Sequence, residues 1–564
     1  MALVQIVHNA VTAKIVNPDR ELKSFMSQLL RYKVVDTDVV DTGGWDGYSS
    51  FFEMRPATFP AGFIRLVKNA LSRDGYKVMV KGKTPPKPQG PENPVVDDFE
   101  EDPRYDYQRK VPGRLISLRG MIARVATGGG KSRIFKLCAE RLDLPTLFVT
   151  TRKSLAYQMA NTYEQDIGKP YGFLGDGKWR PYEKGVNFAI VDTLVSRLEP
   201  TTMLQEARAI IESEEKKIEK KIQAALKKAD LPHDLSVVSN PPPKLLDEIT
   251  RVRRRVVNAN PIDKKQVKDL AQKRFERKEK RRQEAIDLIE KVNFVTFEEA
   301  HEVSGDGFYS LSMALKNAHY RLSLTATPFL KDSEGANMRL MAATGPVGIE
   351  VSEKMLIDRG ILAKPYFKYE QPEVPPKLRK TTPWQSAYAK GIVENYDRNM
   401  RIARNCLQAH QYGLTSMVLI QHSRHGHMLK KLIGSLGLRV DFIYGDKQQD
   451  EREHSLERLR NHEIDVLIGS TILDVGIDVP SIGLVCLAGG GKPEVGIRQR
   501  IGRGLRAKKD GPNVCLIVDF DDRGNKHLKK HSKERRRIVE QTPGFGENIV
   551  ERFDFEGLKF KRVA

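Results

Sequence analysis

The segment VATGGGKS, residues 125–132, combines residue types that bind phosphate groups. Three consecutive glycines allow a tight turn that points several backbone N–H groups inward, and the periodic segment after them predicts a helix whose N-terminus favours negative charge. Lys131 would reach the β- and γ-phosphates of a nucleotide, and the Ser132 hydroxyl would bind Mg²⁺. The strict form of this motif has glycine where this chain has Val125, but the strand expected before it and the helix after it support nucleotide binding. The rest of the cradle comprises Thr127, Gly128, Gly129 and Gly130.

A pair of acidic residues, Glu298 and Glu299, ends the apolar segment VNFVTF, which predicts a buried strand. Ligands bind at the carboxyl edge of open parallel sheets, so the pair is expected beside the phosphate cradle. Hydrolysis of a γ-phosphate needs one carboxylate near Mg²⁺ and another that orients or deprotonates the attacking water. Their order assigns the metal role to Glu298 and the water role to Glu299. The alternative without a catalytic role is that the two residues form an exposed acidic pair at the end of a strand.

These residues require a parallel sheet to position them, and the chain predicts two. From Tyr105 to about Val351, four apolar runs alternate with helical stretches, which is typical of a doubly wound α/β domain. The pattern recurs after Lys364 with five more apolar runs. The predicted strands are TLFVTT, NFAIVDT, NFVTF and YRLSLTAT in the first domain, and SMVLIQ, RVDFIYG, DVLIGST, GLVCLA and NVCLIVDF in the second.

The interval 199–291 fits neither sheet, because it is dense in Lys, Arg and Glu and has no run able to form a core strand. It predicts two or three long helices inserted in the first α/β domain. A solvated structural arm and a surface that touches nucleic acid are equally good interpretations.

Composition indicates a polyanionic partner. The chain has 564 residues, a formal net charge of +22 and a pI near 9.6, and clustered Lys and Arg displace counterions from phosphate backbones. Its four cysteines are widely spaced, which disfavours a disulfide framework or a zinc site and fits a reducing compartment. There is no apolar run of membrane-spanning length, so we expect an intracellular, cytoplasmic protein.

The first 83 residues predict a small α+β domain with a helix near Phe63–Asp74, followed by a proline-rich acidic linker. Six aromatic residues gather in its middle: Trp45, Tyr48, Phe51, Phe52, Phe59 and Phe63. Exposed aromatics such as Trp45 could stack on unpaired bases, but so many aromatics in a small domain more often form its core.

Taken together, the motifs resemble those of the superfamily 2 helicases, specifically the DExH branch. The resemblance runs from about Tyr105 to about Val518 and implies two tandem RecA-like domains that use ATP and Mg²⁺ to move on nucleic acid. In YDYQ, the resemblance implies that Gln108 contacts adenine. TTRKSLAYQ and VDTL resemble strand-contacting motifs. They place Thr151, Arg152, Asp192 and Thr193 near a nucleic-acid backbone.

Further motifs extend the resemblance into the second domain. LSLTATP matches the element that couples the state of the bound ATP to nucleic-acid binding. STILDVGIDVP matches a motif in which Gly476 and Asp478 lie near the nucleotide and Thr471 lies near the nucleic-acid strand. QRIGRGLR places Arg503 and Arg506 at the arginine-finger positions, where guanidinium groups suit the charge on a transferring phosphoryl. The residues to which the resemblance gives a coupling role are His301, Thr325, Ala326, Thr327 and Gln499.

The accessory parts resemble those of phage branch-migration helicases of the UvsW type and of XPB-like repair helicases, which implies forked or junction DNA as the substrate, 3′-to-5′ movement and, for a phage protein, the cytoplasm of a bacterial host. Three alternatives stay open: an RNA helicase, a double-stranded DNA translocase subunit that does not separate strands, and a nucleotide-dependent DNA clamp without turnover. The expected boundaries are 1–83 for a nucleic-acid-binding domain, 84–103 for a linker, 104–351 and 352–540 for the two RecA-like domains, and 541–564 for a C-terminal tail.

Overall fold

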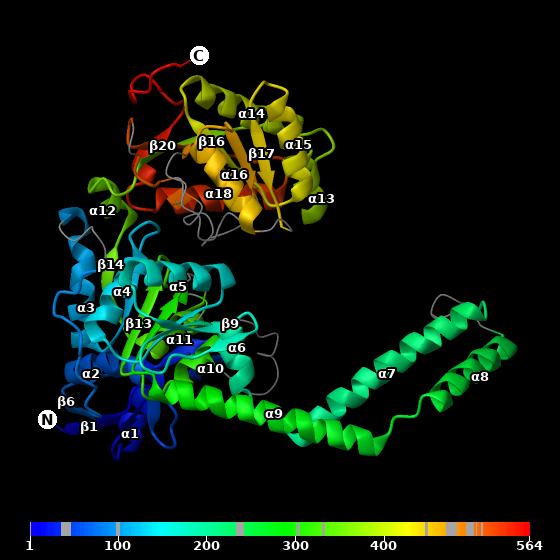
Figure 1. Ribbon diagram of the computed structural model, residues 1–564. Coiled ribbons are helices and arrows are strands. Elements are labelled where there is room, and N and C mark those ends of the chain that lie inside the picture. Colours follow the sequence, from blue (N-terminus) through cyan, green and yellow to red (C-terminus); the bar gives the residue numbers. More distant parts are fainter. Residues whose placement is uncertain are drawn as a thin grey trace. The chain divides into compact units, whose positions relative to one another are not determined.

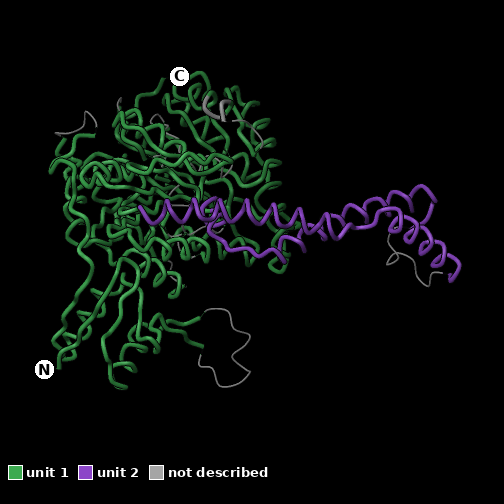
Figure 2. The backbone as a smooth tube through the Cα atoms, turned by 60° about the horizontal axis from the view of Figure 1, so that its bottom comes forward, with its two compact units in different colours: residues 1–191, 292–564 green, residues 192–291 purple. Residues whose placement is uncertain are grey.

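The computed structural model divides the chain into two compact units, one formed by Met1–Val191 with Val292–Ala564 and the other by Asp192–Lys291 (Figure 2). No helix among the described residues is both long enough and apolar enough to cross a membrane. The structure describes residues 2–34, 47–96, 102–232, 242–300, 302, 305–329, 333–445, 449–469, 482–491, 501–502, 505–508 and 511–563.

The N-terminal part of the first unit is a four-stranded sheet in the order β5-β2-β1-β6, in which only β1 and β6 run parallel. The helix predicted near Phe63–Asp74 is confirmed as α2, Ile64–Arg73. The other elements are β1 (Leu3–His8), β2 (Thr12–Ile15), α1 (Arg20–Leu29), β3 (Arg31–Lys33), β4 (Tyr48–Ser50), β5 (Thr58–Pro60) and β6 (Lys77–Gly82).

Four of the six clustered aromatics lie in or against the core of this part, whereas Tyr48 is exposed. Phe52, Phe59 and Phe63 are buried, and the Phe51 ring lies 5.4 Å from that of Phe63. The hydrophobic core interpretation is therefore confirmed for these residues. Trp45 lies outside the described residues, so its predicted base contact stays a prediction.

The proline-rich segment after Gly82 runs along the first α/β domain. The Gln89 N–H donates to the Leu142 carbonyl at 2.9 Å, and the Tyr320 hydroxyl donates to the Pro86 carbonyl at 2.9 Å. Proline has no backbone N–H to donate and disfavours helices and strands. A few isolated hydrogen bonds therefore hold this segment against the domain.

The first α/β domain contains an eight-stranded sheet in the order β10-β9-β11-β8-β12-β13-β7-β14, parallel except for the hairpin β9–β10. All four strands predicted here are confirmed as β8, β11, β12 and β13. The bounds are β7 (Gly120–Val125), β8 (Thr146–Thr150), β9 (Tyr171–Gly175), β10 (Lys178–Arg180), β11 (Val186–Ile190), β12 (Phe294–Glu298), β13 (Tyr320–Thr325) and β14 (Val347–Val351).

Helices cover both faces of this sheet, as a doubly wound fold requires. The connections β7–β8 and β8–β9 lead across the sheet in one direction, whereas β12–β13 and β13–β14 lead in the other. Because crossovers are right-handed, α4 and α5 lie on one face and α10 and α11 on the other (Figure 1). The bounds are α3 (Asp106–Leu118), α4 (Lys131–Leu142), α5 (Lys153–Ile167), α10 (Asp306–Ala314), α11 (Glu334–Thr344) and α12 (Glu353–Asp358).

The second α/β domain has a seven-stranded sheet in the order β17-β18-β16-β19-β20-β15-β21, and every described pair is parallel. Its five predicted strands are confirmed. The strands are β15 (Lys364–Glu370), β16 (Thr415–Leu419), β17 (Val440–Ile443), β18 (Val466–Gly469), β19 (Ile482–Cys486), β20 (Val514–Phe520) and β21 (Ile549–Val550). The helices are α13 (Trp384–Tyr388), α14 (Tyr396–Gln411), α15 (Ser423–Gly434), α16 (Gln449–Arg460) and α18 (Lys526–Glu540).

The residues after α18, predicted as a tail, complete the second sheet and its core. β21 pairs with β15, and Phe553, Phe555 and Phe560 are buried against the apolar side chains of that sheet. The Phe555 ring stacks on Tyr412 at 4.3 Å.

The second unit is helical, as the charged interval predicts. Its described residues include most of α6 (Val191–Leu198) and three longer helices, α7 (Met203–Lys228), α8 (Pro243–Ala259) and α9 (Lys264–Lys291). Two small apolar clusters hold them together, one around Ile210, Val267 and Ala271 and the other around Ile222, Leu226 and Ile249. Most other side chains of these helices are exposed, which explains why the sequence is so charged.

Candidate active site

Several predicted site residues of the first domain lie at the carboxyl edge of its sheet. In the parallel register Phe297 pairs with Val149, Glu298 with Leu324, and Thr325 with Arg124. The last residues of β7, β8, β12 and β13 therefore stand in one row. This edge is where open α/β sheets bind ligands.

The phosphate cradle follows β7 directly and leads into α4, which begins at Lys131. Gly128 and Gly130 have φ angles of 86° and 78°, in the left-handed region that L-residues rarely adopt. A Cβ at Gly130 would lie 2.2 Å from the Gln108 Nε2 atom, so a larger residue would displace the Gln108 side chain. The turn and the exposed first N–H groups of α4 form the anion-binding geometry that the glycines predict.

Gln108 braces this loop from behind. Its Nε2 donates to the Gly129 carbonyl at 3.0 Å, and its Oε1 accepts from Arg133 at 2.8 Å. The Tyr107 hydroxyl also donates to the Gly129 carbonyl, at 2.7 Å, and burial raises the pKa of Tyr107 to about 12. Both ends of the Gln108 amide are thus engaged within the protein. The bracing was not expected from the sequence, and the adenine contact of Gln108 stays a prediction.

Glu298 is the last residue of β12 and is 5% exposed. Burial raises the pKa of its carboxyl to about 8, an effect that the Lys131 ammonium opposes and the Glu299 carboxylate increases. Its Oε2 has no hydrogen-bond partner among the described residues. A buried carboxylate that lacks a partner is costly, so this one fits a site that receives a cation.

Glu299 follows in a turn with a φ of 50°, uncommon for a residue other than glycine. Such strained conformations are concentrated at functional sites, where the surrounding structure enforces them. Ser132, the second residue of α4, exposes its side chain. No three His, Cys, Asp or Glu side chains converge among the described residues.

Glu302 connects the strand-contacting motif with the acidic pair, and the sequence did not predict this role. The Thr151 hydroxyl donates to its carboxylate, and the Arg152 Nη2 lies 3.7 Å from Glu302 Oε1. The strand-contacting motif after β8 is thereby tied to the segment that carries the acidic pair. No local pattern signals this contact, because its partners are 151 residues apart.

The Thr-Ala-Thr element ends β13 at the same edge. Thr325 is buried, and its Oγ1 accepts from the Thr327 N–H at 3.2 Å. Ala326 is buried as well, and the Thr327 hydroxyl has no partner among the described residues. Asp192 and Thr193 lie at the start of α6, immediately after β11 and Val191, with Asp192 exposed.

Arg506 is the one predicted site residue of the second domain within the described part of the chain, and its backbone forms an isolated bridge with Leu362. Five others were predicted at positions outside that part: Thr471, Gly476, Asp478, Gln499 and Arg503. His301 of the first domain also lies outside it.

These features define a class of protein: two tandem parallel-sheet α/β domains, the first with a glycine-rich phosphate loop and a buried acidic residue at its carboxyl edge. Two known families match the chain in its α/β regions. The family described as "Type III restriction enzyme, res subunit" matches residues 104–330, and "Helicase conserved C-terminal domain" matches residues 399–508. The two matches identify the chain as a superfamily 2 helicase, a class that uses ATP in general, and the predicted superfamily is confirmed at this level. The DExH branch stays a prediction.

Relatives and solved structures include other helicases. "Putative helicase 22" of Sulfolobus islandicus filamentous virus is 25% identical over 42% of this chain and 44% of its own length. "Putative DNA 3'-5' helicase Rad25" of Haloarcula marismortui is 28% identical over 42% of this chain and 38% of its own length. The chain thus spans less than half of each of these relatives. RNA helicases occur among the relatives too. The solved structure "The crystal structure of T4 UvsW" covers 98% of this chain and 99% of its own, with 15% identity and a TM-score of 0.41.

Proposed function

We propose that the chain is a DExH-type ATP-dependent DNA helicase or translocase that acts on forked or junction DNA in recombination, repair or replication. The observation that carries the ATPase part is the carboxyl edge of the first sheet, where Lys131 and the buried Glu298 accompany a glycine cradle. The DNA part is supported by the sequence Glu-Glu-Ala-His at residues 298–301, because Asp-Glu-Ala-Asp is commoner in RNA helicases. A relative named as a DNA 3'-5' helicase adds support.

The residues at this edge would share the work of hydrolysis. The cradle N–H groups and Lys131 hold the phosphates, while Ser132 and Glu298 hold Mg²⁺, which neutralises charge on the phosphate oxygens when bound. Glu299 orients or deprotonates the attacking water. Arg503 and Arg506 supply positive charge from the second domain.

Glu302 would couple the nucleotide state of this site to the residues that bind nucleic acid. Thr151 and Arg152 are expected to contact the phosphate backbone, yet Glu302 accepts their hydrogen bond and ion pair here. A carboxylate and a nucleic-acid phosphate compete for the same donors, so a movement of the Glu299–Glu302 turn frees or occupies them. This arrangement connects hydrolysis to binding through one side chain.

The arm is a second candidate for nucleic-acid contact. α9 has 11 basic and six acidic residues. Lys273, Arg277 and Lys280 follow the i, i+4, i+7 spacing of one helix face, and all three are exposed. None of them pairs with a carboxylate within the part of the chain described, whereas Lys278 pairs with Glu206 at 2.5 Å. An uncompensated row of cations suits a phosphate backbone.

A panel of polymers tests the proposal. ATP hydrolysis is measured without polymer and with single-stranded DNA, duplex DNA, a four-way junction and RNA. We expect the strongest stimulation by a branched DNA. Stimulation that is strongest with RNA would overturn the DNA assignment in favour of an RNA helicase. Stimulation by plain duplex without strand separation would favour a translocase subunit, and binding without turnover would favour a clamp.

A further inference from the structure

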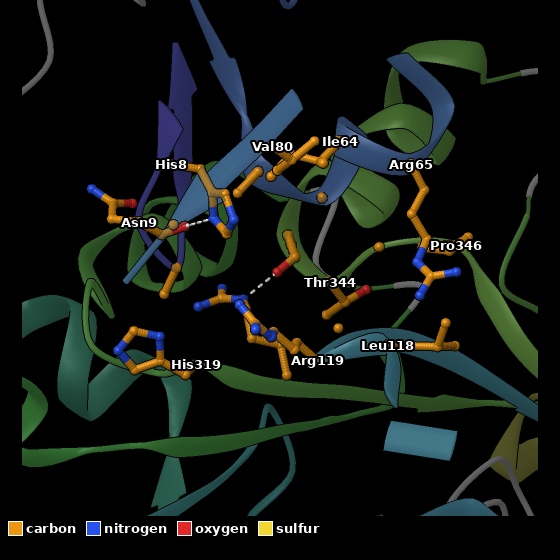
Figure 3. A pocket seen from close by; sticks show the side chains of 18 of the residues that line it. His8, Asn9, Ile64, Arg65, Val80, Leu118, Arg119, His319, Thr344 and Pro346 are labelled. Atoms are coloured by element: carbon orange, nitrogen blue, oxygen red, sulfur yellow. Dashed lines mark hydrogen bonds between the residues drawn. The ribbon is translucent and has the colours of Figure 1, made fainter. Parts of the chain in front are cut away.

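A cavity of about 710 Å³ lies where the N-terminal sheet meets the first α/β domain (Figure 3). Its walls come from the ends of β1 and β6, the start of α2, the end of α3 and the segments before β7 and β13. The two parts are held together here, because Met338 and Ala342 of α11 are buried in the core of the N-terminal part. The Arg65 Nη2 also donates to the Ser117 carbonyl at 3.5 Å. The cavity is therefore a fixed feature of the first unit.

The lining of the cavity is basic. Its titratable residues are His8, Arg65, Lys81, Arg119, His319 and Arg321, and its lining includes no Asp or Glu. Figure 3 shows His8, Arg119 and His319 facing the same space from three different segments. With no negative charge on the walls, the positive potentials of Arg65, Lys81 and Arg119 add.

Arg321 is a buried cation without a counter-charge. It is 5% exposed, and its guanidinium donates to the carbonyls of Ser312 at 2.6 Å, Leu315 at 3.3 Å and Ala343 at 2.5 Å. None of its described partners is a carboxylate, and burial lowers the pKa of Arg321 to about 9. Carbonyl oxygens satisfy its hydrogen bonds but leave its charge uncompensated, and such charges are normally paired.

Two further groups show that positive charges crowd at this place. Burial lowers the pKa of His319, and the charges of Arg119, Lys83 and His8 lower it further. Arg119 adopts a φ of 65°, and its carbonyl accepts from the Arg321 N–H at 2.8 Å. A strained residue that holds one more cation at this wall is unfavourable for stability and is typical of a functional site.

We propose that this cavity is a second ligand site of the protein, which binds a phosphate-bearing ligand of nucleotide size. Arg and Lys side chains form strong charge-assisted hydrogen bonds with phosphate oxygens, and the volume lies within the usual range for small-ligand pockets. The phosphate can belong to a free nucleotide or to a nucleic-acid chain, since both present the same group. A bound phosphate supplies the negative charge that Arg321 lacks.

This site is separate from the candidate active site. Gly120, at the first position of β7, lines the cavity, whereas Val125 at the other end of the same strand leads into the phosphate cradle. Five residues of strand correspond to roughly 17 Å. In β13 (Tyr320–Thr325) likewise, Arg321 near one end lines the cavity, whereas Thr325 lies at the other end. The two sites are at opposite edges of one sheet.

The test uses Lys131→Ala protein, in which the phosphate-binding lysine of the active site is absent. Binding of ADP and of a short 5′-phosphorylated single-stranded oligonucleotide is measured at low salt by equilibrium dialysis. Arg119→Glu and Lys81→Glu should each weaken binding of at least one probe by about tenfold or more, because each reverses a charge at the wall. Lys77→Glu is the matched control, since Lys77 is exposed on the same strand as Lys81 but does not line the cavity, and should change binding by less than about twofold.

The two probes separate the sources of the phosphate. A loss of ADP binding alone identifies a free nucleotide as the ligand, a loss of oligonucleotide binding alone identifies nucleic acid, and a loss of both means that the site accepts either. Equal binding of both probes to all the variants would overturn the proposal. If Arg119→Glu unfolds early in a melting experiment, Lys81→Glu alone decides, because its side chain is exposed. Failure of the active-site assignment would instead appear as ATP hydrolysis that survives Lys131→Ala.

Discussion

The first α/β domain and the inserted arm hold their helices in opposite ways. In the domain, Phe135 packs against Phe148, Phe188 and Phe294 with ring centroids 4.8 to 6.4 Å apart. The strands β8, β11 and β12, which carry the last three rings, are buried at every position. In the arm, two small apolar clusters hold together helices most of whose other side chains are exposed. The domain can thus fix a few groups precisely at one edge. The arm instead presents many similar charges, and precise placement matters little for binding a phosphate backbone.

The sharpest expected contrast is at the acidic pair. Glu299→Gln keeps the size of the side chain but removes its ability to accept a proton, so we expect ATP hydrolysis to fall by at least about a hundredfold. ATP binding should persist, because the cradle and Lys131 are unchanged. Steady-state hydrolysis and nucleotide binding are measured on the same preparation. A rate within a few fold of the wild type would refute the water role of Glu299.

Charge reversal in the arm should produce a smaller and different effect. The triple variant Lys273→Glu, Arg277→Glu and Lys280→Glu should bind nucleic acid about ten- to a hundredfold more weakly and reduce the salt slope of binding by roughly three. Hydrolysis without polymer should not change. The matched control exchanges the same positions conservatively, as Lys273→Arg, Arg277→Lys and Lys280→Arg. If the charge-reversed and the conservatively substituted variants bind nucleic acid equally well, the arm is a structural extension only.

Glu298→Asp addresses the length of the side chain near Mg²⁺. Aspartate is one methylene shorter, which matters little if water bridges the carboxylate and the metal, and we expect hydrolysis to stay within about tenfold, or roughly 1.4 kcal/mol in barrier. The rate is measured over a range of Mg²⁺ concentrations. A much larger loss that extra Mg²⁺ does not restore would mean that the glutamate length is itself required.

Glu298→Gln should change how stability depends on pH in the absence of metal. The folded pKa of Glu298 is about 8, against an ordinary value of 4.5, so the folded state retains a proton that the unfolded chain has lost. The stability from this proton is fully present below pH 4.5 and is lost as the pH rises to 8, by up to about 4 kcal/mol. The wild type should therefore melt several degrees lower at pH 8 than at pH 5, relative to Glu298→Gln. Parallel melting curves would show that Glu298 is ionised in the folded protein.

The sequence predicted nine of the parallel strands and the sheet edge at which the phosphate cradle and the acidic pair lie, because both depend on local patterns. The roles of these residues stay predictions. Buried parallel strands are continuous apolar runs, and the residues that follow them must meet at one edge. The contacts that were missed join distant segments. Gln108 braces Gly129, and Glu302 holds Thr151 and Arg152, through pairings that no periodicity encodes.

The aromatic cluster shows a second limit of sequence analysis. The composition of residues 43–67 fits both a core and a base-stacking surface, and only packing decides between them. Phe52, Phe59 and Phe63 are core residues in the structure. The basic cavity was not foreseen for the same reason, since His8, Lys81, Arg119 and His319 are far apart in the chain.

The most direct test of the account is ATP hydrolysis by the wild type and by Lys131→Ala, with and without branched DNA. The account predicts hydrolysis by the wild type that DNA stimulates, and a loss of at least about a hundredfold in Lys131→Ala under both conditions, because the phosphates lose their lysine. Rates that are equal for the two proteins would contradict the claim that the carboxyl edge of the first sheet is the ATPase site.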